Sequence, residues 1–290
     1  MIRLVDERYG AEASIDIDRG NRVASLSFQG NNVLHTPGMP FLAPWANRMP
    51  GGFHAQGRYY ALDPQVGNLE TDSGGIPIHG LLSNSPLWEI VRQTESSITN
   101  RLQFWRFPGL MAQWPFAHEY DTTYRLAGGA MEVSVEIKNS GRLQMPVAIG
   151  FHPYFTIPGV PRRDWRVRVP ARSRVVHDEH VLPTGELAAA GLPELVSLAG
   201  YTFDSGYTAL EHNPRFRIEG GGRSLEIQFD GQWPVAIVWG PEGEEFLCIE
   251  PMAAPTNGIN LHHRGLWSGL QWISPGAVWR GNFRITGHGF

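Results

Sequence analysis

The chain has a single cysteine, Cys248, so it cannot form an intramolecular disulfide. It contains no run of 18 consecutive apolar residues, and its first ten residues lack the apolar stretch of a secretory signal peptide. Only one of the 24 basic residues is a lysine, Lys138, and the net charge of −4 offers no basic surface for nucleic acid or for an anionic membrane. These absences favour a cytoplasmic protein with a small neutral ligand and with no nucleic-acid or membrane partner.

Glycine and proline are abundant, with 34 and 22 residues, and this predicts many turns. Short segments of alternating hydrophobicity follow one another closely, which indicates strands, whereas only residues 193–199 and the loop near Ser83 favour a turn or two of helix. The expected strands are residues 12–18, 22–28, 32–35, 87–93, 97–105, 118–126, 131–139, 145–150, 165–169, 174–176, 207–211, 215–218, 225–229, 235–239, 246–250 and 278–286. No linker or repeat interrupts them, so residues 1–290 are expected to form one domain, a large antiparallel all-β sandwich.

Residues 36–78 form a long, proline-rich connection without regular periodicity. A connection of this length is usually functional. It carries Asn47 and Arg48, and a guanidinium can donate to several hydroxyls at once, although a structural role for this arginine is equally open. It leads to His79 and Gly80, where a glycine backbone would let a ligand approach closely; His79 can equally be a surface-loop histidine.

The sequence Phe151-His152-Pro153-Tyr154-Phe155 places an imidazole between aromatic residues and directly before a proline. Proline restricts the backbone of the residue that precedes it, so the imidazole is held in place. The ordinary pKa of histidine, about 6.5, suits proton transfer near neutral pH. His152 is therefore a candidate acid or base acting on a sugar, and its alternative role is that of a core histidine bonded to a carbonyl.

Two carboxylates lie where strands meet turns. Glu250 ends an apolar strand and precedes Pro251, so burial is expected to raise its pKa toward the range of a general base. Asp204 is expected at a turn just before a strand, where it is either a ligand-binding or a turn-forming residue. Glu244 and Glu245, in a charged turn, are expected to be solvated.

In their order and spacing these fragments resemble the aldose 1-epimerase family, the galactose-mutarotase-like proteins. The fragments are Asn47-Arg48, His79-Gly80, Phe151-His152-Pro153-Tyr154-Phe155, Leu182-Pro183-Thr184-Gly185-Glu186, Phe203-Asp204 and Cys248-Ile249-Glu250-Pro251 with Asn257. The resemblance implies a sandwich of the mutarotase (supersandwich) type and an isomerase that interconverts sugar anomers without a cofactor or metal. By position, it implies that Glu250 is the general base on the C1 hydroxyl and His152 the general acid at the ring oxygen. It also implies that His79 assists them, and that Arg48, Asp204 and Asn47 hold sugar hydroxyls.

One departure from the family pattern concerns the substrate. Glucose and galactose mutarotases usually carry a sugar-binding glutamine on the strand before the glutamate, and its position here falls on Ile237. The sugar is therefore open, and hexose-6-phosphate mutarotase activity is an alternative. The arginines that could serve a phosphate are Arg58, Arg106, Arg162 and Arg163.

Three other classes compete with the mutarotase interpretation. A carbohydrate-binding protein on the same fold would not need a paired acid and base. A glycoside hydrolase would use Asp204 and Glu250 as its two carboxylates but would leave the histidines idle. A cupin-type metal site would draw on His79, His152, His262, His263 and Glu250, yet the site histidines lack close ligand spacing, and His262 and His263 would point to opposite faces of an extended segment.

Overall fold

The computed structural model describes residues 1–66 and 69–290. Half of the residues are in strands and 7% are helical, which confirms the predicted all-β class. The largest sheet has nine strands in the order β18 (Val196–Ser197), β15 (Arg166–Arg168), β20 (Arg215–Gly220), β21 (Arg223–Phe229), β25 (Val278–His288), β11 (Ala130–Asn139), β10 (His118–Ala127), β9 (Ser97–Gln103) and β8 (Glu89–Gln93).

The second sheet has eight strands and carries the candidate site. Its order is β17 (Pro183–Ala189), β16 (Ala171–His177), β19 (Phe203–Leu210), β22 (Val235–Gly240), β23 (Leu247–Met252), β13 (Gly150–Phe151) and β5 (Phe41–Leu42), with β14 (Tyr154–Phe155) also paired to β23. Every pairing between the strands of these two large sheets is antiparallel.

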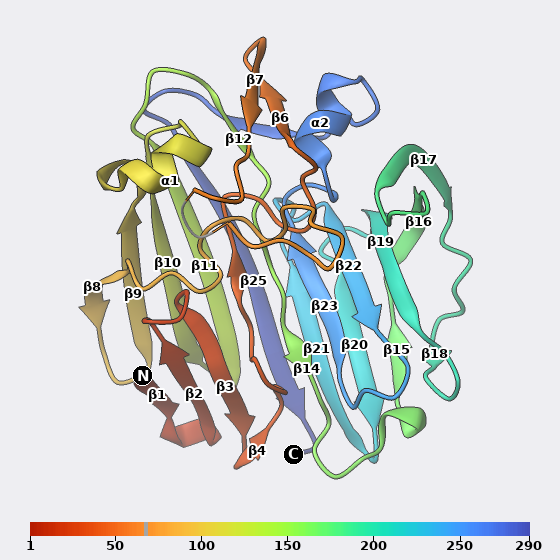
Figure 1. Ribbon diagram of the computed structural model, residues 1–290. Coiled ribbons are helices and arrows are strands. Elements are labelled where there is room, and N and C mark those ends of the chain that lie inside the picture. Colours follow the sequence, from red (N-terminus) through yellow and green to blue (C-terminus); the bar gives the residue numbers. More distant parts are fainter. Residues whose placement is uncertain (67–68) are drawn as a thin grey trace.

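Smaller sheets complete the fold. Strands β1 (Ile2–Asp6), β2 (Ala11–Asp16), β3 (Arg22–Phe28) and β4 (Asn31–Asn32) form a four-stranded sheet, and β12 (Met145–Val147) pairs with β24 (Gln271–Ile273). The hairpin β6 (Gly52–Ala55) and β7 (Arg58–Ala61) projects at the top of the molecule, beside the short helices α1 (Pro108–Gln113) and α2 (Gly258–His263) (Figure 1).

The nine-stranded sheet forms the back layer of a sandwich, and the four- and eight-stranded sheets lie in front of it (Figure 1). Strands β1 and β2 pack against β10, and one buried hydrophobic cluster runs between the layers. The alternating pattern of β10 and β20 explains this arrangement, because alternate side chains in a strand point to opposite faces. One face of each strand thus fills the interior of the sandwich.

Strand β23 differs from these strands in being buried along its whole length. Leu247 and Ile249 belong to the cluster between the layers, so the alternation directs Cys248 and Glu250 to the other face of the sheet. That face is covered in part by the connection that follows β4, since Leu42 and Ala46 pack there with Met252. Glu250 was expected to end its strand, but the strand continues to Met252, and the glutamate lies under this cover and not in open solvent.

Several sequence-based expectations were wrong. Residues 193–199 contain strand β18 and no helix, and Ser83 lies in a turn, while the two helices form elsewhere, at α1 and α2. The connection of residues 36–78 is not structureless, because it contains β5, β6 and β7. Helix α2 holds His262 and His263, so these histidines are not on an extended segment. Among the described residues, no helix has the length and apolar character needed to cross a membrane.

Candidate active site

The register of the eight-stranded sheet places side chains of β14, β22 and β23 next to one another on one face. Glu250 on β23 lies directly opposite Ile237 on β22, and Cys248 lies opposite both Trp239 on β22 and Tyr154 on β14. Directly opposite residues of an antiparallel pair point to the same face. These five side chains therefore share the face of the sheet that is turned away from the interior of the sandwich.

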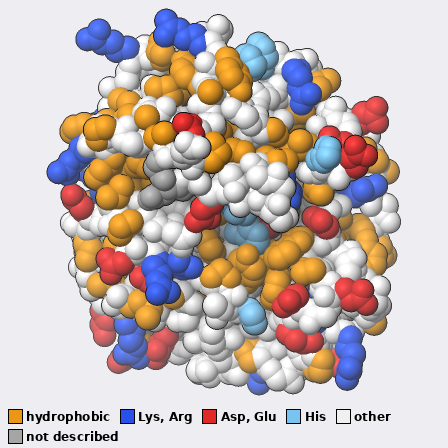
Figure 2. Space-filling view, in the orientation of Figure 1, with side chains coloured by type: hydrophobic (Ala, Val, Ile, Leu, Met, Phe, Trp, Pro, Cys, Tyr) orange, Lys and Arg blue, Asp and Glu red, His pale blue; other side chains and the backbone are white. Residues whose placement is uncertain are grey.

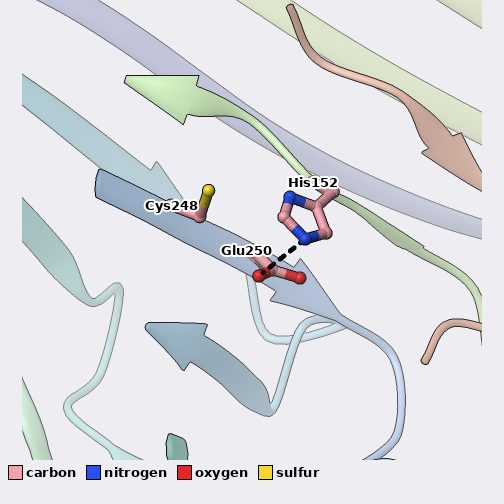
Figure 3. Close-up of side chains that lie close together, drawn as sticks. All are labelled: His152, Cys248 and Glu250. Atoms are coloured by element: carbon pink, nitrogen blue, oxygen red, sulfur yellow. Dashed lines mark ion pairs between the residues drawn. The ribbon is translucent and has the colours of Figure 1, made fainter. Parts of the chain in front are cut away.

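The closest pair of ionisable groups on this face is His152 and Glu250. The Nε2 atom of His152 lies 3.4 Å from Oε1 of Glu250 (Figure 3). Glu250 is 1% exposed, and its Oε2 accepts no hydrogen bond from any residue that the structure describes. His152 is 8% exposed, and its ring stacks on Tyr154 with a centroid distance of 4.6 Å. The pair is buried and held from one side by aromatic packing.

Burial disfavours the charged form of both groups. Desolvation, and to a lesser extent the carboxylate of Asp204, raises the pKa of Glu250 well above its ordinary value. Desolvation, and then the neighbouring His79, lowers the pKa of His152 to about 3. The two residues therefore hold one proton in total over a wide pH range. A second proton binds to His152 only at low pH, and the proton of Glu250 is lost only at high pH.

His79 lies next to this pair. Its ring meets the ring of His152 edge-to-face with a centroid distance of 5.5 Å. Burial, and then the charge of Arg48, lowers the pKa of His79 to about 4, so the imidazole is neutral at physiological pH. Gly80 does not admit a ligand as expected: a Cβ there would collide with the carbonyl oxygen of Ala43, because the backbone at Gly80 packs closely against that part of the chain.

Asn47 and Arg48 hold the loop that presents His79. The carbonyl of Asn47 accepts a hydrogen bond from the backbone N–H of His79 at 3.1 Å. The Nε of Arg48 donates to Oδ2 of Asp72 at 2.6 Å, which keeps the pKa of that carboxyl below its ordinary value. Arg48 thus has the structural contact that was one of its two expected roles, and its terminal guanidinium nitrogens have no protein partner among the described residues.

Asp204 lies within strand β19, paired with Trp239, and not at a turn before the strand. Its charge acts on Glu250 and on His177, a half-buried residue at the end of β16. Sequence reasoning missed His177, because its place beside Asp204 depends on the pairing of β16 with β19. It also missed Asp72, for which only the structure shows the bond to Arg48.

Aromatic side chains form one wall of the site. Trp239 meets His152 at a centroid distance of 5.7 Å, and Phe246 packs against both Tyr154 and Trp239. Figure 2 shows histidine side chains in a hollow near the centre of this face, with hydrophobic side chains along its lower border.

The candidate phosphate-binding arginines are engaged elsewhere or lie away from the pair. The buried Arg162 donates to the carbonyls of Gly240, Pro241 and Tyr201, and Arg106 pairs with Glu89 at 3.1 Å. Arg58 lies on the projecting strand β7, and Arg163 is exposed in the short 3-10 helix Arg162–Asp164.

Comparison with known proteins gives the family and the fold of the chain. The sequence model of the aldose 1-epimerase family matches residues 5–286, and the chain belongs to that family. The uncharacterized protein YihR of Escherichia coli K12 is 26% identical over 258 residues, which cover 83% of this chain and 80% of YihR.

Solved structures share the fold. A galactose mutarotase-like protein from Clostridium acetobutylicum superposes with a TM-score of 0.86 at 20% identity, covering 97% of this chain and 94% of that one. The GalM/aldose epimerase homologue from C. elegans gives a TM-score of 0.78 at 18% identity and covers 99% and 98% of the two chains. These likenesses confirm the mutarotase-type fold that the sequence fragments predicted.

Proposed function

We propose that this protein is an aldose 1-epimerase that interconverts the α and β anomers of an aldose by acid/base catalysis, without a cofactor. The observation that carries the proposal is the buried pair of His152 and Glu250, whose nearest ionisable atoms lie 3.4 Å apart. A carbohydrate-binding protein does not need two buried proton carriers in contact, and such a pair is costly to bury without a function.

The reaction needs one proton removed from O1 and one delivered to the ring oxygen. Glu250 takes the proton from O1 while His152 protonates the ring oxygen, and the C1–O5 bond breaks to give the open-chain aldehyde. Rotation about the C1–C2 bond then presents the other face of the aldehyde. Reversal of both transfers closes the ring as the other anomer, so the enzyme returns to its starting protonation state.

The one-proton state of the pair suits both halves of this reaction. With the proton on His152 the pair can open the ring, and with the proton on Glu250 it can close the ring. Because burial disfavours the separated charges, the free enzyme favours the neutral arrangement, with Glu250 protonated and His152 neutral. Hydrogen bonds from a bound sugar would favour the ionic arrangement that opens the ring.

The remaining residues are assigned to binding. The charge of Asp204 acts on Glu250, and Arg48 and Asn47 lie beside His79. The exposed carboxylate of Asp204, the side-chain amide of Asn47 and the terminal nitrogens of Arg48, which have no partner in the described part of the chain, offer hydrogen bonds to sugar hydroxyls. His79, neutral and beside His152, assists at the ring or C1 oxygen. The aromatic wall of Tyr154 and Trp239 packs against the sugar ring.

Anomer exchange measured by saturation-transfer NMR tests the proposal on a panel of free and phosphorylated hexoses and pentoses. We expect acceleration of at least one free aldose. A protein that binds sugars in calorimetry yet accelerates no exchange on any of them would instead be a carbohydrate-binding protein on this fold. Faster exchange of phosphorylated sugars alone would point to hexose-6-phosphate mutarotase activity.

A further inference from the structure

Cys248 has no part in the proposed reaction, yet its sulfur lies beside the groups that carry it out. One ligand atom each from His152, Cys248 and Glu250 falls within 4.8 Å of the other two (Figure 3). All three residues are buried, and Cys248 and Glu250 are alternate residues of one strand, so β23 aims both at the same point.

The carboxylate in this cluster has an unused oxygen. Oε2 of Glu250 accepts no hydrogen bond from the described part of the chain, although the side chain is 1% exposed. A buried carboxylate oxygen without a donor is costly, and a bound cation would satisfy it. This is independent of the mere proximity of the three residues.

The donor set matches a particular class of cation. Imidazole, thiolate and carboxylate are the side chains that bind Zn²⁺, with bonds of about 2.0 to 2.3 Å, and thiolate selects thiophilic metals over Mg²⁺ or Ca²⁺. Ligand atoms around a tetrahedral Zn²⁺ are therefore roughly 3.3 to 3.8 Å apart. The 3.4 Å separation of His152 Nε2 and Glu250 Oε1 already meets this requirement, and the sulfur of Cys248 lies within 4.8 Å of the ligand atoms of both residues, so it would have to move closer to them on binding.

We propose that His152, Cys248 and Glu250 form a binding site for a thiophilic divalent cation such as Zn²⁺, and that the bound cation inhibits anomer exchange. The inhibition rests on the proposed function, whereas the binding does not. Coordination displaces the proton of the Cys248 thiol and the one proton that His152 and Glu250 share, and both protons are released to solvent. The imidazole nitrogen and the carboxylate that would otherwise exchange protons with the sugar are then occupied. The three protein ligands leave a fourth position for water.

Titration of the native protein with Co²⁺, followed by absorption spectroscopy, tests the binding. Tetrahedral coordination that includes a thiolate gives intense visible bands and a sulfur-to-cobalt charge-transfer band in the near ultraviolet, and added Zn²⁺ should remove both. Zn²⁺ should also inhibit exchange, and a chelator should restore it. Charge-transfer absorption that is absent from the native protein would overturn the proposal.

Substitutions of Cys248 test whether the cation binds at this cluster. Cys248→Ala and Cys248→Ser should keep native exchange but lose the charge-transfer band. Loss of an outer-shell partner alone typically costs a metal site about 10- to 100-fold in affinity, so loss of a ligand should weaken Zn²⁺ inhibition by roughly 100-fold or more. Unchanged Zn²⁺ inhibition in both variants would overturn the proposal.

A matched control tests whether the cation binds instead to a second pair of histidines, near the surface. His54 and His263 stack with a centroid distance of 4.2 Å and could take up Zn²⁺ by themselves. The double variant His54→Ala/His263→Ala should retain the cobalt spectrum and the Zn²⁺ inhibition, and loss of both would place the cation there and refute the proposal. A native protein with the cobalt spectrum but no exchange on any sugar would overturn the proposed function and leave the cation site standing.

Discussion

Glu250→Gln tests the catalytic and the electrostatic account of the site in one variant. Glutamine keeps the shape of the side chain, and its amide can donate to Nε2 of His152, 3.4 Å from the atom it replaces, when the imidazole proton is on Nδ1. The variant therefore loses the base with little loss of packing. We expect exchange to fall by roughly 10²- to 10⁴-fold, the usual contribution of general acid/base catalysis, while sugar affinity changes little.

The same substitution should stabilise the fold, increasingly so at higher pH. Burial raises the pKa of Glu250 in the folded state above its unfolded value, so the carboxyl binds its proton more tightly when folded. The resulting stability is fully present below the unfolded pKa and is lost as pH rises through the folded pKa. Glutamine does not titrate, so the variant does not lose this stability as the pH rises.

The size of this effect follows from the linkage relation. Each unit by which the folded-state pKa is raised corresponds to about 1.36 kcal/mol of stability lost at high pH. For a chain of this size, 1 kcal/mol moves Tm by roughly 2 °C. The difference in Tm between Glu250→Gln and the native protein should thus grow from pH 5 to pH 9.

Thermal denaturation at several pH values and NMR exchange on the same samples measure both effects. Glu244→Gln is the matched control, because it makes the same chemical change on an exposed glutamate in the neighbouring turn, and it should alter neither quantity. Near-native exchange in a folded Glu250→Gln protein would refute the role of this residue as the base. A Tm difference that does not depend on pH would refute the raised pKa.

Further predictions concern the other site residues. His152→Asn should lower exchange as Glu250→Gln does, and the double variant should be little worse than either single one in NMR exchange, since a proton taken without one delivered achieves nothing. Arg48→Ala should mainly raise KM, because its hydroxyl contacts are made to ground state and transition state alike, and a loss confined to kcat would contradict this. The rate constant should fall at high pH as the pair loses its proton. Its fall at low pH should occur well below pH 6.5, because the pKa of His152 is lowered to about 3. A fall on the acid side near pH 6.5 would refute the one-proton state of the pair. Asp204→Asn and Ile237→Gln should each move the high-pH limb to lower pH in the same assay. Exchange should survive exhaustive chelation, and activity that requires an added divalent ion would contradict the metal-free mechanism.

The residues of the pair could be predicted from the sequence because local signals mark them. Glu250 follows an apolar run and precedes a proline, and His152 precedes a proline between aromatic residues, so each was recognisable within a few residues. The alternation of apolar residues likewise predicted most strands of both large sheets.

What the sequence could not supply was the register between strands. The places of Cys248, Trp239 and His177 in the site depend on which residues of distant strands lie opposite each other, and no local pattern encodes this. The same limit explains the misplacement of Asp204, whose strand begins at Phe203. The helices α1 and α2 are six residues long, too short to show a helical period.

The departure at Ile237 and the raised pKa of Glu250 have a common physical cause. Ile237 lies directly opposite Glu250 on the same face, at the distance where cross-strand side chains touch. A glutamine there would offer an amide donor to the carboxylate, and a hydrogen bond to the charged form lowers a carboxyl pKa. Isoleucine instead adds apolar surface and leaves Oε2 without a donor. Isoleucine at this position is therefore expected to strengthen the binding of the proton to Glu250, and we propose that the residue at position 237 affects both the choice of sugar and the working pH.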